Sequence, residues 1–232
     1  MATPSIVQET SAVAAVSKTS ESVTFASNVT AGNVLVIAVM KAVSGVRFFT
    51  VADNVNGAWT ELVKQTDHVQ INYFLNAGAG ATTVTVTVGD GLSISFDFKC
   101  FEISGVDAVD TFGSDSEITN STTHQCANPK LSASAENFIL TASACPYDAS
   151  FGTITKNVNY TSEYVSVDGT KSLQSRISES ALTNQDAEWI SSFSRGSLSV
   201  MGIFKNSAAG GGTPFLPIFN KKFITNNTLL RS

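Results

Sequence analysis

Charge, histidine and cysteine are all scarce in this sequence. Charged residues make up 14% of its 232 residues, whereas an average domain holds roughly 25%. Most of the polar surface must therefore come from serine, threonine, asparagine and glutamine, which favour strands and turns over helices. The formal net charge is −5. This acidic balance argues against nucleic acid as a partner, because binding to phosphate needs a cationic surface.

The three cysteines, Cys100, Cys126 and Cys145, are an odd number at wide spacing, which fits neither a disulfide framework nor a metal site. Cys100 lies in a strand-like pattern and is expected to be a small buried side chain. Cys126 and Cys145 could pair with each other or stay reduced. Together with the lack of a glycine-rich phosphate loop, this composition predicts no metal and no cofactor.

Targeting and membrane-spanning patterns are also missing. The first residues, Met1–Ser5, have neither a basic start nor an apolar stretch, so we expect no signal peptide. No apolar run approaches the ~18 residues that a membrane helix needs, so we expect no membrane partner. The chain is therefore expected to be made in a cytosol. If it acts outside the cell, it travels there as part of an assembly.

The sequence does contain a succession of short strand patterns. Residues 33–40 are apolar on both faces and predict a central buried strand, and residues 137–144 predict another. Val84, Val86 and Val88 alternate with threonines, as in a strand that is buried on one face. Many such segments between turn signals predict an all-β fold: a two-sheet antiparallel β-sandwich, jelly-roll-like, with an extended C-terminal tail. Closure into a barrel is the alternative.

The pattern changes in three places. Apolar residues up to Cys100 share one face of an expected strand, whereas Phe101 and Ile103 have the opposite parity. This phase change predicts either a β-bulge near Cys100 or a strand end that is buried on both faces. Residues 106–128, rich in serine, threonine and aspartate, predict a loop. Residues 180–190 are the one segment whose pattern could hold a helical turn.

Candidate catalytic residues are few. His68 and His124 are the two histidines, neither has neighbours at metal-ligand spacing, and both are expected to be exposed at a loop or strand end. A nucleophile elbow that would supply a serine is missing. Residues 53–57 predict a hairpin turn, because their spacing fails that of a calcium loop.

The densest acidic cluster consists of Asp107, Asp110, Asp115 and Glu117. Glycoside hydrolysis uses two carboxylates about 5–10 Å apart in a cleft, whereas carboxylates gathered in one loop more often form a solvated surface. We therefore expect that the protein is not an enzyme. A polysaccharide-degrading enzyme is kept as a third hypothesis.

Aromatic rings suggest a second hypothesis, a carbohydrate-binding module that contacts host or environmental glycans. Exposed rings can stack on the C–H faces of sugars. Trp59, Tyr147 and Tyr160 are the candidate glycan contacts. For each of them, packing in the core or at its rim is the alternative.

The C-terminal part is the strongest functional signal. Residues 1–206 are expected to form the β-sandwich body, residues 207–212 a flexible glycine-rich linker, and residues 213–232 a hydrophobic and basic anchoring peptide. The peptide holds three cations and no acid, so the net charge of −5 leaves −8 for the rest of the chain. A free peptide of this kind would expose a large apolar patch, which marks an interface. The residues expected to anchor it are Phe215, Leu216, Ile218, Phe219, Lys221, Lys222, Phe223 and Ile224.

Proline residues in this peptide favour an extended form. Extended peptides bind by adding a strand to a sheet edge or by filling a groove. The alternative is that the peptide folds back onto its own body, since a flexible linker gives reach without direction.

Four segments resemble a β-sandwich domain of tailed-bacteriophage virion surface proteins and of bacterial surface proteins. They are residues 31–36 (Ala-Gly-Asn-Val-Leu-Val), 53–60, 77–86 and 102–107. The resemblance covers the first half of the body and implies a capsid decoration, fibre or tail-surface protein, sometimes with glycan binding. It transfers no functional residue.

These observations predict a non-enzymatic structural component of a tailed-phage virion. It is expected on the virion surface after synthesis in the host cytoplasm. The expected partners are other virion proteins of the capsid or tail, bound through the C-terminal peptide, and further copies of the chain in a homo-oligomer. Glycans are partners under the second hypothesis.

Overall fold

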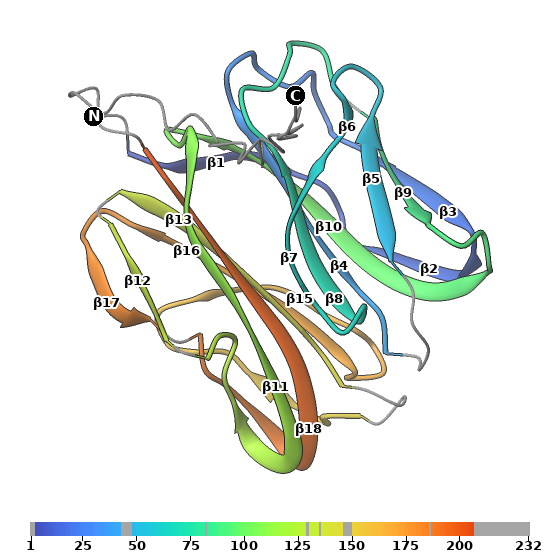
Figure 1. Ribbon diagram of the computed structural model, residues 1–232, viewed down its shortest axis with the longest axis vertical. Coiled ribbons are helices and arrows are strands. Elements are labelled where there is room, and N and C mark those ends of the chain that lie inside the picture. Colours follow the sequence, from blue (N-terminus) through green and yellow to red (C-terminus); the bar gives the residue numbers. More distant parts are fainter. Residues whose placement is uncertain are drawn as a thin grey trace, which may run out of the picture.

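The protein is an antiparallel all-β sandwich in the computed structural model (Figure 1). The structure describes residues 3–42, 48–81, 83–128, 130–134, 136–145, 150–185 and 187–206. Within these ranges every regular element is a strand, which confirms the predicted fold class. The predicted linker and anchoring peptide, residues 207–232, lie outside the described residues.

Sheet A is one of the two large sheets that face each other in the described part of the chain. Its strand order is β1-β10-β4-β8-β7, and β2 also pairs with β10. Because β1 and β2 pair with different halves of β10, they share one edge of the sheet. The strands are β1 (Ser5–Glu9), β2 (Val13–Lys18), β4 (Val34–Met40), β7 (Thr60–Gln65), β8 (Val69–Phe74) and β10 (Ile94–Ser104).

Sheet C is the second large sheet, with the order β11-β18-β13-β16-β15 and with β14 beside β18. Its longest strands, β11 and β18, run side by side to one tip of the molecule (Figure 1). The strands are β11 (Ala108–His124), β13 (Asn137–Ala144), β14 (Ile154–Thr155), β15 (Thr161–Val165), β16 (Lys171–Ser178) and β18 (Trp189–Lys205).

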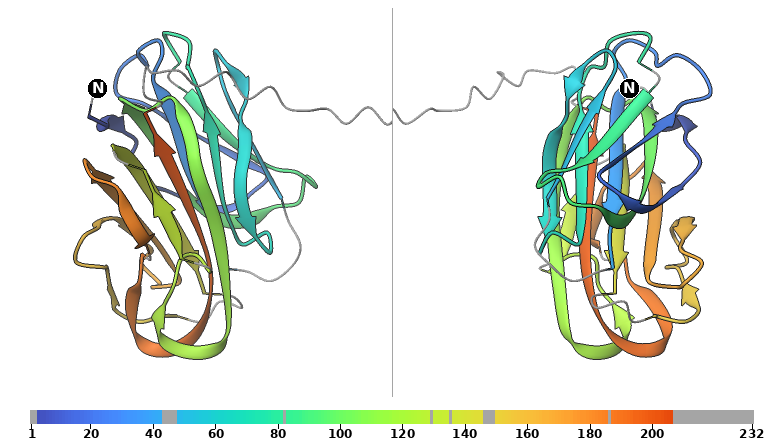
Figure 2. Two further views of the ribbon diagram at one scale, coloured as in Figure 1. Left: turned by 60° about the vertical axis from the view of Figure 1, so that its left-hand side comes forward. Right: turned by 90° about the vertical axis from the view of Figure 1, so that its right-hand side faces the viewer.

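Smaller sheets cover the outer faces of the sandwich. Sheet B consists of β3 (Ser20–Thr24), β9 (Thr83–Val88), β5 (Phe49–Asp53) and β6 (Gly57–Ala58), and sheet D of β12 (Leu131–Ala133) and β17 (Leu182–Gln185). Sheet B packs on sheet A through one hydrophobic cluster, and sheet D packs on sheet C through another. The described residues therefore form the layers B, A, C and D, as the turned views show (Figure 2).

The outer face of sheet B carries hydroxyl groups. The valines of β9 point inward to the cluster against sheet A, so the threonines between them point outward. The threonines pair across the ladder with Ser20, Ser22 and Thr24 of β3. The hydroxyl oxygens of Ser22 and Thr85 lie 2.8 Å apart. A strand buried on one face was predicted here, and the structure confirms it.

The central strands of both large sheets are buried on both faces, because each large sheet is covered on both sides. Every residue of β4 and of β13 is buried, as predicted. On β10, Phe96 and Cys100 face sheet B, whereas Phe101 and Ile103 face sheet C. The ladder between β10 and β4 runs in regular register. The phase change in the sequence therefore reflects burial on both faces, one of the two predicted alternatives.

Two predictions about local structure are wrong. Residues 108–124 form the 17-residue strand β11 instead of a loop, because β18 supplies a ladder partner along almost their whole length. β11 is an edge strand with many polar side chains, so it lacks the apolar alternation that would reveal it. Residues 182–185 form β17, paired with β12, instead of a helical turn.

Gly202 of β18 lies where the two large sheets approach each other closely. A Cβ atom there would lie 2.6 Å from Cδ2 of Leu62 on β7 and 3.5 Å from Cδ1 of Ile71 on β8. We expect Gly202→Val to lower the free energy of unfolding by about 1–3 kcal/mol through overpacking, as measured by urea denaturation. The double variant Leu62→Ala/Gly202→Val should lose less than the two single variants together. Additive losses would contradict the close approach.

Candidate functional site

Two of the three predicted glycan contacts lie in the hydrophobic core. Trp59 is 7% exposed and packs between sheets A and B, and Tyr160 is 2% exposed and packs on the outer face of sheet C. A stacking platform needs an exposed ring face, so neither ring supplies the predicted contact in this structure. Tyr147 lies outside the described residues.

The carboxylate of Asp53 explains the position of Trp59. Its Oδ1 accepts the backbone N–H groups of Val55 and Asn56 at 2.7 and 2.6 Å, and its Oδ2 accepts Asn56 Nδ2 at 2.9 Å and Trp59 Nε1 at 2.7 Å. Burial on its own would raise the pKa of Asp53, but these hydrogen bonds together lower it below its ordinary value. The ionised side chain closes the hairpin, and Gly57 takes a positive φ of 78°. The predicted turn is thereby confirmed.

Both histidines are buried, so the prediction that they are exposed is wrong. The ring of His124 stacks on Trp189 with the centroids 4.1 Å apart, and it lies 5.2 Å from the ring of Phe151. Burial lowers the pKa of His124 to about 4. This environment could not be predicted from the sequence, because His124 ends the strand that was predicted as a loop.

The contact between His124 and Ser191 is structural. His124 Nε2 lies 2.9 Å from Ser191 Oγ, and Ser191 Oγ donates its proton to the backbone oxygen of Phe193 at 2.7 Å. The hydroxyl proton therefore points to a carbonyl group and not to the imidazole, and both side chains are buried. An activated serine would instead donate its hydroxyl proton to the imidazole nitrogen.

The predicted acidic cluster does not gather into one loop. Asp110 and Asp115 lie on β11, and Asp107 precedes it. Asp110 Oδ1 lies 2.8 Å from Lys205 Nζ, and its other oxygen accepts the backbone N–H of Ser134 at 2.7 Å. The side chain of Glu117 lies outside the described residues. The carboxylate of Asp110 therefore ties β11 to the end of β18 and to the backbone at Ser134.

The three cysteines are buried, and none forms a disulfide in the described part of the chain. Cys100 is a buried strand residue, as predicted. Burial raises the pKa of Cys145 to about 11. The open alternative for Cys126 and Cys145 is therefore resolved in favour of two reduced thiols.

The densest group of buried charges lies between sheets A and C, where β10 faces the β15–β16 hairpin. Residues 96–99 alternate phenylalanine with charge, so Phe96 and Phe98 point to sheet B and the two charged residues point to sheet C. Opposite them, β15 and β16 supply counter-charges. We call this group the charge seam; it consists of Asp97, Lys99, Glu163, Tyr164 and Lys171.

Lys99 holds one half of the charge seam. Its Nζ lies 2.9 Å from Glu163 Oε2 and 2.9 Å from Glu9 Oε1. The side chains of Lys99 and Glu163 are only 7% and 6% exposed, and Ser175 donates a hydrogen bond to the second carboxylate oxygen of Glu163. Two buried opposite charges thus join sheet A to sheet C. A pocket of about 510 Å³ lies beside them, lined by Glu9, Glu163 and Arg176 among others.

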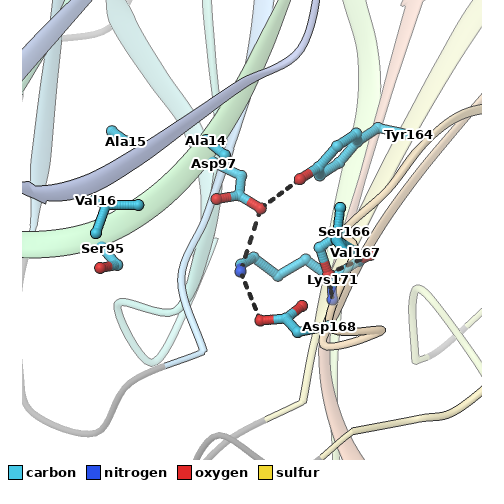
Figure 3. Close-up of a pocket in the computed structure, with 10 residues that line it drawn as sticks. All are labelled: Ala14, Ala15, Val16, Ser95, Asp97, Tyr164, Ser166, Val167, Asp168 and Lys171. Atoms are coloured by element: carbon cyan, nitrogen blue, oxygen red, sulfur yellow. Dashed lines mark hydrogen bonds and ion pairs between the residues drawn. The ribbon is translucent and has the colours of Figure 1, made fainter.

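Asp97 and Lys171 form the other half of the charge seam (Figure 3). Both side chains are almost fully buried. Lys171 Nζ lies 3.2 Å from Asp97 Oδ2 and 3.8 Å from Asp168 Oδ2. Tyr164 donates its hydroxyl proton to Asp97 Oδ2 at 2.7 Å. Burial, together with the neighbouring Asp97, raises the pKa of Tyr164, which keeps the phenol protonated as a donor.

Asp168 stands at the turn between β15 and β16. Burial on its own would raise the pKa of this carboxyl group, but hydrogen bonds from Ser166 and Thr170 and the charge of Lys171 together lower it. Asp168 is therefore ionised at neutral pH. Gly169 follows with a φ of 66°, a backbone conformation that glycine adopts without steric cost.

A pocket of about 360 Å³ opens beside Asp97 and Lys171 (Figure 3). Ala14 and Val16 of β2 and Ser95 of β10 line one side, and the β15–β16 turn lines the other. Each described carboxylate of the charge seam is paired with a lysine, whereas glycoside hydrolysis needs a carboxyl group that can give up a proton. This arrangement suits joining the sheets and presenting fixed polar groups better than it suits proton transfer.

No family model matches this chain, and no curated protein and no solved structure matches it. Within the ranges that the structure describes, no helix is long and apolar enough to cross a membrane. The same residues bring together no set of three or more histidine, cysteine, aspartate or glutamate side chains that could hold a metal ion. The resemblance to virion domains therefore remains a prediction from the sequence.

Proposed function

We propose that this protein is a non-enzymatic structural component of a tailed-bacteriophage virion, namely a capsid decoration, fibre or tail-surface protein. The β-sandwich body is displayed on the particle. Residues 213–232 anchor it to a capsid or tail protein or to a neighbouring copy.

The proposal rests on the change in amino-acid composition after residue 206. The sheets of the described chain lie within residues 5–205. At the end of β18, Lys205 pairs with Asp110, and the backbone N–H of Asn206 donates to the oxygen of Glu136 at 3.3 Å. The sequence beyond this point is first glycine-rich and then aromatic, aliphatic and basic. Such a peptide is stabilised most by burying its apolar side chains against a partner.

Two further observations support the proposal. The lysine-paired carboxylates of the charge seam favour a structural role over a catalytic one. The segments that resemble virion domains lie in and beside the strands of sheets A and B: residues 31–36 lead into β4, 53–60 contain the turn between β5 and β6, 77–86 lead into β9, and 102–107 end β10. The resemblance therefore concerns one contiguous part of the fold.

Deleting residues 207–232 tests the anchor. The truncated chain should keep its far-ultraviolet circular dichroism and its cooperative unfolding, because the described sheets are retained. Its amount in gradient-purified particles, measured by quantitative immunoblot, should fall by at least about tenfold, as expected when the central contacts of an interface are lost. Truncated protein at full occupancy in the particle would contradict the anchor.

A full-length pair of variants refines this test. Phe219→Ser/Phe223→Ser removes two predicted anchors, and Asn226→Ala/Thr228→Ala changes polar residues of the same peptide as a matched control. Only the first pair should reduce incorporation. Immunoelectron microscopy of purified particles tests the location itself: particles that never carry the wild-type protein would rule out the virion role.

A further inference from the structure

We infer that the pocket between β2, β10 and the β15–β16 turn binds a neutral ligand with adjacent hydroxyl groups, such as one sugar residue. The inference goes beyond the proposed function and does not depend on it. It also concerns a different surface from the aromatic residues that the sequence suggested.

The floor of this pocket presents an acceptor and a donor side by side. Asp97 Oδ2 is occupied by Tyr164 and Lys171, while the other oxygen of Asp97 points toward β2 (Figure 3). An ammonium group has three N–H donors, and two carboxylates, those of Asp97 and Asp168, lie next to Lys171 Nζ. One ligand hydroxyl can therefore donate to Asp97 while the next accepts from Lys171.

These two groups are held in place before any ligand arrives. The Asp97 and Lys171 side chains are almost fully buried and are fixed by each other and by Tyr164. Binding then orders few side chains, and ordering them is a main cost of association. Hydrogen bonds to ionised partners are also stronger than those between neutral groups.

The charges favour a neutral ligand. Two carboxylates, Asp97 and Asp168, and one ammonium group, Lys171, line the pocket, so its formal charge is negative. An anion would face both carboxylates, and a cation would lie next to the ammonium group. A hydroxyl group can donate to the one and accept from the other without either repulsion.

The walls fit the apolar edge of a small ring. Ala14, Val16 and Val167 line the pocket with small or branched aliphatic side chains, and Val16 and Val167 are exposed. The volume of about 360 Å³ lies at the low end of the ~300–1,000 Å³ that is usual for small-molecule sites. Since no aromatic ring other than Tyr164 lines this pocket in the described residues, one site should bind weakly. Several copies on one assembly would add avidity.

The test uses the full-length chain and four probes: glucose, galactose, mannose and the open-chain polyol glucitol. Binding is followed by the NMR signals of isotope-labelled alanine and valine methyl groups. At least one probe should shift the methyl signals of Ala14, Val16 and Val167 in a saturable way. Saturable shifts by none of the probes would overturn the inference, as would stronger binding of free alanine or inorganic phosphate at these methyl groups.

A blocking variant makes the test specific. Ala14 is exposed and lies opposite Asp97 in the ladder, so Ala14→Trp fills the pocket without changing the ion pair. It should weaken binding, followed at Val16 and Val167, by at least about tenfold, which is the loss of roughly one ordinary hydrogen bond. Ala58→Trp, at an exposed strand residue of sheet B, is the matched control and should bind as the wild type does. Equal binding by both variants would overturn the inference.

A variant that removes the charge of Asp97 tests the role of this carboxylate at the floor of the pocket. Asp97→Asn keeps the shape of the side chain and should weaken binding by about tenfold, because a charge-assisted hydrogen bond is lost. Its folding is checked by circular dichroism, and Ala14→Trp decides the question if Asp97→Asn unfolds. Neither variant touches residues 207–232, so failure of this inference leaves the test of the anchor unaffected.

Discussion

Replacing Lys99 with methionine is expected to lower the free energy of unfolding by about 3–5 kcal/mol. Methionine fills much of the same space but leaves the carboxylate of Glu163 buried without its counter-charge. Removal of one partner from a buried ion pair is costly for this reason, although the intact pair need not be worth as much. Urea denaturation at neutral pH measures the effect.

Two comparisons separate this effect from the loss of a charge as such. Lys64→Met removes a lysine that is 42% exposed and lies 3.5 Å from Glu61, and it should change stability by less than about 1 kcal/mol. The double variant Lys99→Met/Glu163→Gln should recover most of the loss, because no buried carboxylate is then left without a counter-charge, Glu9 being 43% exposed, and glutamine still accepts from Ser175. Equal losses for Lys99→Met and Lys64→Met would contradict a buried charge seam.

Acidification is expected to destabilise the protein through His124. Burial lowers the pKa of this histidine from 6.5 to about 4 in the folded state, so the unfolded chain binds a proton at higher pH than the folded one does. The contribution of the neutral His124 ring to the free energy of unfolding is therefore fully present above pH 6.5. It is lost progressively as the pH falls toward 4. The full loss from this one group is about 3 kcal/mol. Urea denaturation across this pH range measures the slope.

A variant without the titrating ring provides the comparison. His124→Gln should be less stable at neutral pH, because the stack on Trp189 is lost, but its stability should vary less between pH 6.5 and 4. Some slope should remain from His68, whose pKa is also lowered by burial. His68→Gln is therefore the matched control. Identical slopes for the wild type and His124→Gln would show that His124 does not titrate in this way.

The sequence predicted the interior of the fold well, because the alternation of odd and even positions along a strand decides which face of the sheet each side chain lies on. Leu198, Val200 and Phe204 lie in the cluster between the large sheets, whereas Met201 and Ile203 lie in the cluster on the outer face, as their opposite parity predicts. The rule works wherever both neighbouring layers are apolar. It does not tell which layer lies on which side, so the stacking of the sheets could not be derived.

The charge seam could not be predicted because its partners come from distant parts of the chain. Asp97 and Lys99 alternate with phenylalanines in a strongly apolar segment, and this is the signal that could have pointed to buried charges. Their counter-charges, Glu163 and Lys171, lie in a segment with weak alternation. The edge strand β11 was missed for a similar reason, since polar residues on an edge need only a backbone partner, and that partner, β18, is remote in sequence.

Under the proposed virion role, the hydroxyl face of sheet B has a consequence for the surface of the particle. Serine and threonine side chains do not titrate in the ordinary pH range, and a surface without ions has little for dissolved salt to screen. A particle coated with such faces would keep the same outer chemistry from dilute water to brine. Mutual attraction or repulsion between two coated particles would then change little when the medium does.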